Sequence, residues 1–294
     1  MRRYQFVHLD VFTHLPFTGN QLAVFTDARG LSDEEMQMLA REMNLSETTY
    51  ILPTDQPTEA ERGVRVRIFT IDEELPFAGH PTLGTAWAVR EMRGGLNDQI
   101  KLCLNVGTIP VHFSTVEDRL FGEMRQRDPE FGRIHDREAL ARAAGIPLED
   151  FDPELPIQTV STGLAYGIVP LRSLEAIRRL RFSYVQLHDF LAHADTKFLY
   201  FVTRETVDPA ARLHARMIFY SGEDPATGSA AGDAAAWMVK YGVAKSDERV
   251  LIEQGIEMRR PSRIFVRATR DGDRVVNVRV GGNVVEVMRG EVFL

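Results

Sequence analysis

This chain of 294 residues has little cysteine, few long apolar runs and no excess of positive charge. A single cysteine, Cys103, allows no internal disulfide and no cysteine-based zinc cluster. No apolar run approaches the ~20 residues that a membrane-spanning helix requires. The formal net charge of −7 argues against a surface for nucleic acid or an anionic membrane. With no signal-peptide pattern at its start, the sequence predicts a cytoplasmic protein that binds neither nucleic acid nor membrane.

The common motifs of metal and nucleotide sites are also missing. No HxxxH pair or Cys/His cluster is present, no GxGxxG follows a strand, and there is no GxxxxGK[ST]. No GxSxG elbow indicates a hydrolase. Cys103 lies in an alternating, strand-like stretch, where it is predicted to be a small buried apolar residue and not a nucleophile. We therefore expect no cofactor and no metal.

Short alternating segments rich in β-branched and aromatic residues predict strands through most of the chain. Two helices stand out in the first half. Ser32 and Glu35 have the spacing of a capping box at the start of an amphipathic helix predicted over 32–43. A second, alanine-rich helix is predicted over 81–92, ahead of a glycine pair that stops it. Many strands with few helices predict an α+β fold.

The second half of the chain repeats the plan of the first. The stretch LPFAGHPTLGTAWAV recurs as DPATGSAAGDAAAWM. In this match Gly79 and His80 stand opposite Gly228 and Ser229, with a proline three residues before each glycine. Several other segments match in the same order, so a duplicated α+β unit explains the pattern best.

The repeat predicts two pseudo-symmetric domains, residues 1–125 and 126–283, each a mixed barrel-like β-sheet wrapped around one alanine-rich helix. The sequence leaves open whether a last strand near 284–294 joins the first domain. Four apolar residues of the two helices are predicted to lie in the interior: Leu83, Trp87, Trp237 and Met238.

A glycine and a polar residue stand at the start of each of these helices, as Gly79-His80 and as Gly228-Ser229. Glycine lets a backbone approach a ligand closely, and a first helical turn has unpaired N–H groups and a positive dipole end. Such a terminus binds a carboxylate or phosphate without a lysine. If the two domains face each other, both termini point into one cleft. The alternative is a plain helix cap by Ser229, with glycines that only form a tight turn.

Three titratable side chains belong to the repeated segments. Glu47 begins a strand after the capped helix, Asp224 precedes the proline of the second repeat, and His80 belongs to the first. A glutamate at such a place is usually only solvated. A carboxylate in an enclosed cleft has its pKa raised toward neutrality, which makes it a competent base and acid. Proton transfer next to a carbonyl, imine or enamine requires a set of this kind and no metal.

Five motifs together resemble a known family. They are PFTGNQLAVF, LSETTYIL, LPFAGHPTLGTA, GEDPATGSAAG and EQG followed by RPSRI. This set is similar to the PhzF-like isomerase family of phenazine biosynthesis, which shares the fold of diaminopimelate epimerase. The resemblance runs nearly end to end, and the GHPT and EDPATGSA motifs are the most specific. Where the family often reads Gly-Arg-Pro-Ser, this chain has Arg259-Arg260-Pro261-Ser262.

The resemblance implies cofactor-independent acid–base catalysis at a site between two pseudo-symmetric domains, commonly in a homodimer. In the phenazine-pathway member a glutamate moves a proton between carbons of dihydro-3-hydroxyanthranilate, and Glu47 matches its position. The epimerase relatives use two cysteines, but those positions hold His80 and Ser229 here, so two-thiol racemisation is excluded. The resemblance assigns the remaining roles as follows: His80, Asp224 and Ser229 assist catalysis, and Asn20, Gly79, Gly228 and Ser229 bind substrate.

The sequence thus predicts an isomerase that shifts a proton within a small carboxylated substrate. An epimerase or racemase acting at one stereocentre is the first alternative. A carboxylate-binding protein without turnover is the second, although a nearby Glu47 carboxylate would hinder simple binding of an anion.

Overall fold

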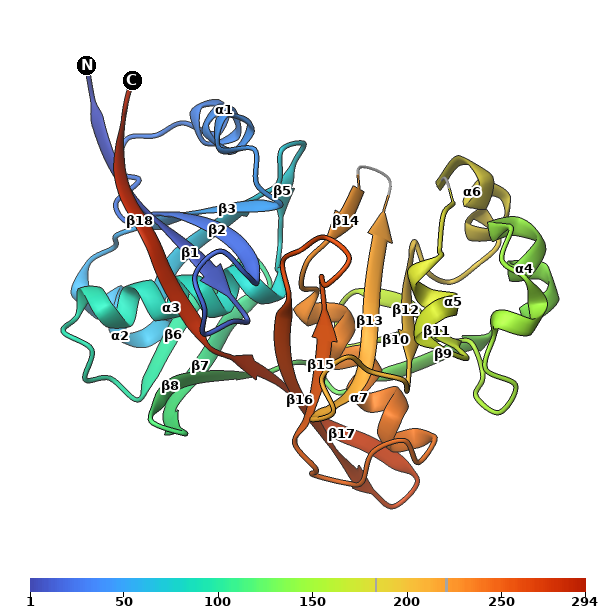
Figure 1. Cartoon of the computed structure of the whole chain (residues 1–294). Coiled ribbons are helices and arrows are strands. Elements are labelled where there is room, and N and C mark those ends of the chain that lie inside the picture. Colours follow the sequence, from blue (N-terminus) through green and yellow to red (C-terminus); the bar gives the residue numbers. More distant parts are fainter. Residues whose placement is uncertain (183, 220–221) are drawn as a thin grey trace. The chain divides into compact units, whose positions relative to one another are not determined.

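The computed structural model of this chain describes residues 1–182, 184–219 and 222–294. It divides into two compact units (Figure 1). Unit 1 comprises Met1–Arg125 together with Gly281–Leu294, and unit 2 comprises Gln126–Val280. Each unit combines a mixed sheet with helices, which confirms the predicted α+β fold.

Unit 1 is a strand-rich body built around one helix, α3. This helix contacts β1, β2, β3, β6, β7, β8 and β18, so its apolar side chains are enclosed by sheet on most sides. The final strand β18 pairs antiparallel with β1, although the two lie at opposite ends of the chain (Figure 1). The elements of unit 1 are β1 (Arg3–Val11), β2 (Asn20–Phe25), α1 (Asp33–Met43), β3 (Glu47–Leu52), α2 (Gln56–Arg62), β4 (Val64–Phe69), β5 (Glu74–Leu75), α3 (Gly79–Met92), β6 (Gln99–Leu104), β7 (Gly107–Val116), β8 (Arg119–Arg125) and β18 (Val284–Phe293).

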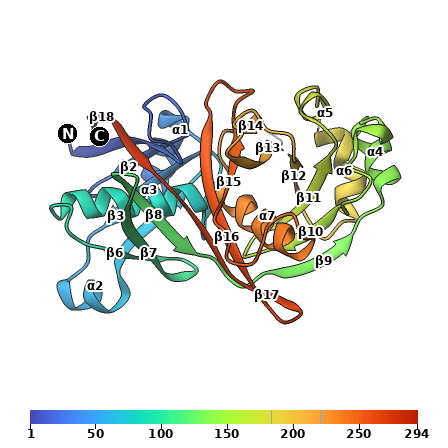
Figure 2. The ribbon, with the colours of Figure 1, turned by 60° about the horizontal axis from the view of Figure 1, so that its bottom comes forward.

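Unit 2 has the same plan, with α7 in the place of α3. This helix contacts β10, β11 and β16, and Figure 2 shows it among these strands. The elements of unit 2 are β9 (Glu130–Ile134), α4 (Arg137–Ala144), a 3₁₀ turn (Leu148–Asp150), β10 (Gln158–Ser161), β11 (Ala165–Leu171), α5 (Leu174–Arg178), α6 (Tyr184–Ala192), β12 (Phe198–Thr203), β13 (Ala211–Phe219), β14 (Gly222–Asp224), α7 (Gly228–Lys240), β15 (Val250–Gln254), β16 (Ser262–Asp271) and β17 (Arg274–Gly282), whose last two residues belong to unit 1.

The strand pairings of the two units repeat each other. In unit 1, β2 runs parallel to β3, β3 antiparallel to β4, and β4 parallel to β6. In unit 2, β11 runs parallel to β12, β12 antiparallel to β13, and β13 parallel to β15. The short strand β5 pairs antiparallel with β4 and is followed by α3. In the same way, β14 pairs antiparallel with β13 and is followed by α7. The predicted pseudo-symmetry of the fold is therefore present in the topology.

The predicted capping box of α1 is confirmed. The Ser32 hydroxyl accepts a hydrogen bond from the Glu35 amide, and the Glu35 carboxylate accepts one from the Ser32 amide. The second predicted helix exists, but α3 begins at Gly79 and not near Pro81. Proline can occupy the first turn because the N–H groups there have no intrahelical partner, so its presence did not mark the first residue.

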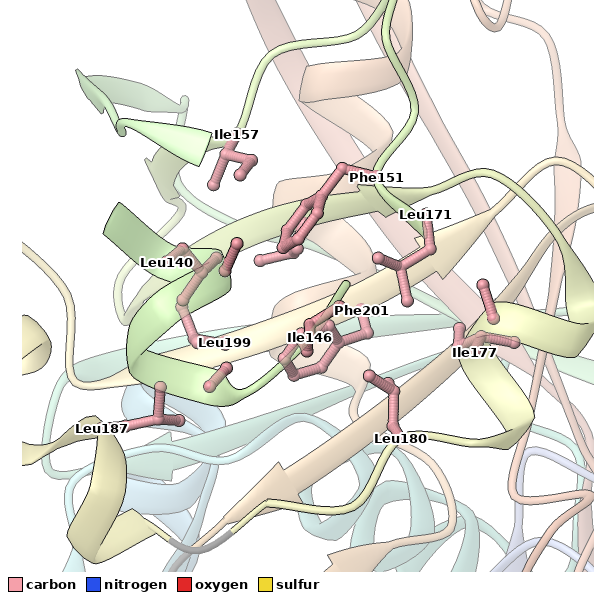
Figure 3. Packing of buried hydrophobic residues seen from close by; sticks show 14 residues of the cluster. Leu140, Ile146, Phe151, Ile157, Leu171, Ile177, Leu180, Leu187, Leu199 and Phe201 are labelled. Carbon is pink, nitrogen blue, oxygen red and sulfur yellow. The ribbon is translucent and has the colours of Figure 1, made fainter. Parts of the chain in front are cut away.

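Each unit has its own apolar core. In unit 2, Phe151, Leu171 and Phe201 belong to one apolar cluster, which also contains Leu140 of α4 and Ile177 of α5 (Figure 3). In unit 1, Phe25 stacks on Tyr50 with ring centroids 5.0 Å apart. Among the residues described, no helix is long and apolar enough to cross a bilayer.

The prediction of buried helix residues is confirmed for three of the four. Leu83, Trp237 and Met238 have no exposed surface. Trp87 is only half-buried, because it faces a cavity of about 580 Å³ that Phe6 also lines. Cys103 is likewise half-buried on β6, so the prediction that it is buried was wrong.

Candidate active site

Glu47 is the first residue of β3, directly after the C-terminal turn of α1. Because β2 and β3 are parallel, with Leu22 beside Glu47, their starting ends share one edge of the sheet. Asn20 begins β2 at that edge. His80 is the second residue of α3, and its Nε2 lies 3.5 Å from Glu47 Oε2. Asn20 Nδ2 lies 3.2 Å from the other ring nitrogen, Nδ1. We call Asn20, Glu47 and His80 the Glu47 cluster.

His80 is neutral in this environment. Its side chain is 4% exposed, and burial lowers its pKa to about 3, against a smaller upward effect of a hydrogen bond with the Gln21 backbone. Near neutral pH the contact with Glu47 therefore joins a carboxyl group to an uncharged imidazole and is not an ion pair. A neutral imidazole has one nitrogen that carries a proton and one that accepts, so it can pass a proton in either direction.

The first turn of α3 lacks a side-chain cap. Its N-cap residue is Ala78, which has no group to bond the amides of the first turn. These amides and the positive end of the helix dipole are therefore free to face an anion. Helices α1, α2, α4 and α5 do have side-chain caps, which are Ser32, Asp55, Asp136 and Ser173.

The corresponding turn of α7 also has no side-chain cap. Its N-cap residue is Thr227, but the Thr227 hydroxyl donates to Asp224 Oδ2 at 2.6 Å and not to the helix. Ser229 is the second helical residue, and its Oγ lies 2.9 Å from the Tyr166 hydroxyl. The alternative in which Ser229 is a plain helix cap is thus wrong. We call residues 224–229 the Asp224 segment; it contains three of the predicted site residues, Asp224, Gly228 and Ser229.

Several polar residues that the sequence analysis missed support the start of α7. Gln126 Nε2 donates to the Gly228 carbonyl at 3.0 Å, and Gln126 Oε1 accepts from the Thr162 hydroxyl at 2.7 Å. The Thr162 amide donates to Asp233 Oδ1 at 2.7 Å. Burial outweighs the hydrogen bonds from Thr162 and raises the pKa of Asp233 well above its usual range, which favours the neutral acid. No short motif marks these residues, because their partners are distant in sequence.

Within the ranges that the structure describes, no three side chains of His, Cys, Asp or Glu are gathered closely enough to hold a metal ion. The chemistry available at the Glu47 cluster is that of a carboxyl group, a neutral imidazole and an amide. Together with backbone amides at an uncapped helix start, these groups suit proton transfer on an anionic substrate.

Known proteins resemble this chain over its whole length. A family model described as "Phenazine biosynthesis-like protein" matches residues 9–290. An isomerase of Mesorhizobium japonicum is 38% identical over 307 aligned positions that cover 100% of both chains. A Pseudomonas aeruginosa protein named trans-2,3-dihydro-3-hydroxyanthranilate isomerase is 35% identical, over 99% of this chain and 100% of its own.

Solved structures agree with the sequence comparison. A PhzF-family phenazine biosynthesis protein of Bacillus anthracis superposes with a TM-score of 0.90 at 29% identity, covering 100% of both chains. A hydroxyproline epimerase of Agrobacterium vitis has a TM-score of 0.66 at 12% identity, covering 99% of this chain and 92% of its own, and it shows the shared fold alone. The two-unit topology, the motifs and these relatives lead to one conclusion: the chain belongs to the PhzF-like family of isomerases.

Proposed function

We propose that this protein shifts a proton within a small carboxylated substrate by general acid–base catalysis, without a cofactor. The observation that carries the proposal is the Glu47 carboxyl group held 3.5 Å from the buried, neutral imidazole of His80. Both groups lie at the uncapped start of α3. A carboxylate beside a neutral imidazole can take a proton from carbon without first competing with a permanent cation.

In the proposed reaction Glu47 is the proton carrier. It removes a proton from one carbon of the substrate, the adjacent double bond shifts, and the protonated Glu47 returns the proton to another carbon. The numbers of protons and electrons in the substrate are unchanged, so no oxidant or co-reactant is required. His80 stabilises the charge that changes on Glu47 and on the substrate, and Asn20 Nδ2, 3.2 Å from Nδ1, holds the imidazole ring in place.

The substrate carboxylate is assigned to the uncapped helix starts and to Ser229. The amides of Gly79 and Gly228 supply the N–H donors of the first turns, where the dipole favours an anion. The Ser229 hydroxyl adds one donor, and Tyr166 lies within hydrogen-bond distance of it, at 2.9 Å. Asp224, the acceptor of the Thr227 hydroxyl, is assigned to orient a polar or cationic group of the substrate.

The first compound to test is trans-2,3-dihydro-3-hydroxyanthranilate. A relative that is 35% identical over essentially the full length is named as its isomerase, which supports a cyclic amino-carboxylate as the substrate class. The resemblance further implies a homodimer of two duplicated domains, and the sequence predicts a cytoplasmic location; we include both in the proposal. Analytical ultracentrifugation at micromolar concentration tests the dimer, and a purely monomeric profile contradicts it.

Proton NMR in deuterium oxide tests the reaction directly. We expect deuterium to appear at a new carbon of the product with the wild-type protein and with Glu61→Gln, an exposed glutamate of α2 that serves as the control. Glu47→Gln should abolish incorporation while substrate still binds. Deuterium returning to the original stereocentre would indicate an epimerase, and ligand binding without exchange would indicate a binding protein. Exchange that persists in Glu47→Gln would overturn the role of Glu47.

A further inference from the structure

Gln254 is a fully buried amide at the end of β15, and three of its four side-chain hydrogen bonds lead to residues just before α7. Its Nε2 donates to the Asp224 carbonyl at 2.7 Å and to Thr227 Oγ1 at 3.0 Å. Its Oε1 accepts from the Thr227 amide at 3.1 Å and from the Tyr200 hydroxyl at 2.9 Å. A glutamine side chain has two N–H donors and an oxygen with two lone pairs. All four hydrogen-bonding positions are therefore occupied.

These bonds fix the direction of the Thr227 hydroxyl. Because Thr227 Oγ1 accepts from Gln254, its own hydrogen is directed to Asp224 Oδ2, 2.6 Å away. The Gln254 amide therefore donates to the Thr227 hydroxyl, which in turn donates to the Asp224 carboxyl group. The Gln254 amide has only one orientation that satisfies its four partners. Gln254 also binds two backbone groups of the segment before α7, the Thr227 amide and the Asp224 carbonyl. These bonds hold the backbone that leads into the uncapped turn of α7.

The residues on either side of Gln254 secure this strand end. Gly255 has φ +78°, and a Cβ there would lie 2.4 Å from the Arg260 carbonyl oxygen and 2.6 Å from that of Pro225. Only glycine permits the Asp224 segment to approach so closely. On the preceding residue, the Glu253 carboxylate accepts from the Val207 amide at 2.6 Å. The EQG motif, to which the sequence analysis assigned no chemistry, is therefore a rigid support next to the Asp224 segment.

We infer that Gln254 is a positioning residue of the proposed active site, which sets the Asp224 carboxyl group and the first turn of α7 for binding the substrate. This inference rests on the proposed function. Gln254 bonds only to protein groups, and it acts through Thr227 and Asp224.

The test compares Gln254→Met with Gln158→Met. Gln158 is another buried amide of unit 2, 4% exposed, and it accepts from the Tyr241 hydroxyl at 2.6 Å, just beyond the opposite end of α7. Both variants lose buried hydrogen bonds, and both should lower Tm. At a temperature where both are folded, Gln254→Met should lower kcat/KM on the order of 10- to 100-fold, the usual effect of a misplaced binding group. Gln158→Met should stay within about twofold.

Gln254→Glu provides a readout that loss of stability alone would not give. A protonated glutamic acid at this position still donates one hydrogen bond, whereas the ionised form donates none and repels Asp224. Activity per folded molecule should therefore fall as pH rises through the titration of the new carboxyl group. Two titratable groups lie near this position: the Tyr200 hydroxyl, which donates to Gln254 Oε1, and the Asp224 carboxyl group, which the Thr227 hydroxyl connects to Gln254. The wild-type and Gln158→Glu profiles should lack this step.

The outcomes separate the two proposals. If the wild-type protein is active, equal losses of kcat/KM in Gln254→Met and Gln158→Met overturn the positioning role. If no carboxylate is turned over by the wild-type protein, the proposed function fails. In that case, hydrogen exchange at the Gly228 and Ser229 amides tests whether Gln254 positions the first turn of α7. Faster exchange at these amides in Gln254→Met than in Gln158→Met supports the inference, and equal exchange refutes it.

Discussion

The buried carboxylic acid of α7 gives a prediction for stability that the pH dependence can test. Asp233 has no exposed surface, and burial raises its pKa well above its usual range. In the unfolded chain the pKa of an aspartic acid is about 3.9. Above that pH the unfolded state loses the proton while the folded state keeps it, so the stability contributed by Asp233 is complete at low pH and falls as pH rises. Asp233→Asn removes this dependence, because an amide does not titrate.

The size of the effect follows from proton linkage. Between the unfolded pKa and the raised pKa of the folded state, one bound proton changes the free energy of unfolding by about 1.4 kcal/mol for each pH unit. The Asn side chain keeps the acceptor for the Thr162 amide, which lies 2.7 Å from Oδ1. The difference in stability between Asp233→Asn and wild type should therefore grow in favour of the variant, by up to about 3 kcal/mol from pH 5 to pH 7.

Urea denaturation followed by circular dichroism measures this difference directly. Other titrating groups are the same in both proteins, so their contributions cancel in the comparison. Asp271→Asn, at an exposed carboxylate at the end of β16, is measured alongside as the control for replacing an aspartate by an asparagine. A constant difference between Asp233→Asn and wild type over this range would refute the assignment of Asp233 as a neutral buried acid.

Three further predictions concern the site and its support. Glu47→Asp shortens the side chain by one methylene and lengthens the 3.5 Å contact with His80, so kcat should fall on the order of 100-fold in the NMR exchange assay; a loss under threefold would contradict direct proton transfer. His80 should show neutral-ring chemical shifts in heteronuclear NMR from pH 5 to 8, because its pKa is about 3, and an inflection near 6.5 would count against its burial. Gly255→Ala should lower Tm by several degrees, since the Cβ would meet two carbonyl oxygens at positive φ; an unchanged Tm would show that the contact relaxes freely.

Local chemistry accounts for the parts of the fold that the sequence predicted well. The α1 capping box needs only Ser32 and Glu35, which are three residues apart, so its bonds form whatever surrounds the helix. The start of α3 was less well placed, because Pro81 fits any position of a first turn. Trp87 was predicted to be interior from its helix alone, but the surrounding strands leave a cavity beside it.

The proposed site likewise combines residues that local sequence predicts with residues that it does not. Gly79-His80 and Gly228-Ser229 were predicted as site residues because a duplicated sequence pattern marks them. Gln254, which hydrogen-bonds to the residues before the second of these turns, was not predicted, since its partners Asp224 and Thr227 are far away along the chain. No spacing rule connects such residues, and only the register of β15 beside β13 brings them into hydrogen-bonding distance.

The amino-acid sequence by itself determined the class of fold, the duplication and the family, because these depend on pattern and residue type, and it supplied the residues of the proposed site. Tertiary structure decided the protonation of those groups and the direction of their bonds. Burial lowers the pKa of His80 and raises the pKa of Asp233, and this burial results from strands and helices that converge from distant parts of the chain. The free energy of a charge depends on what surrounds it, and that environment exists only after the chain has folded.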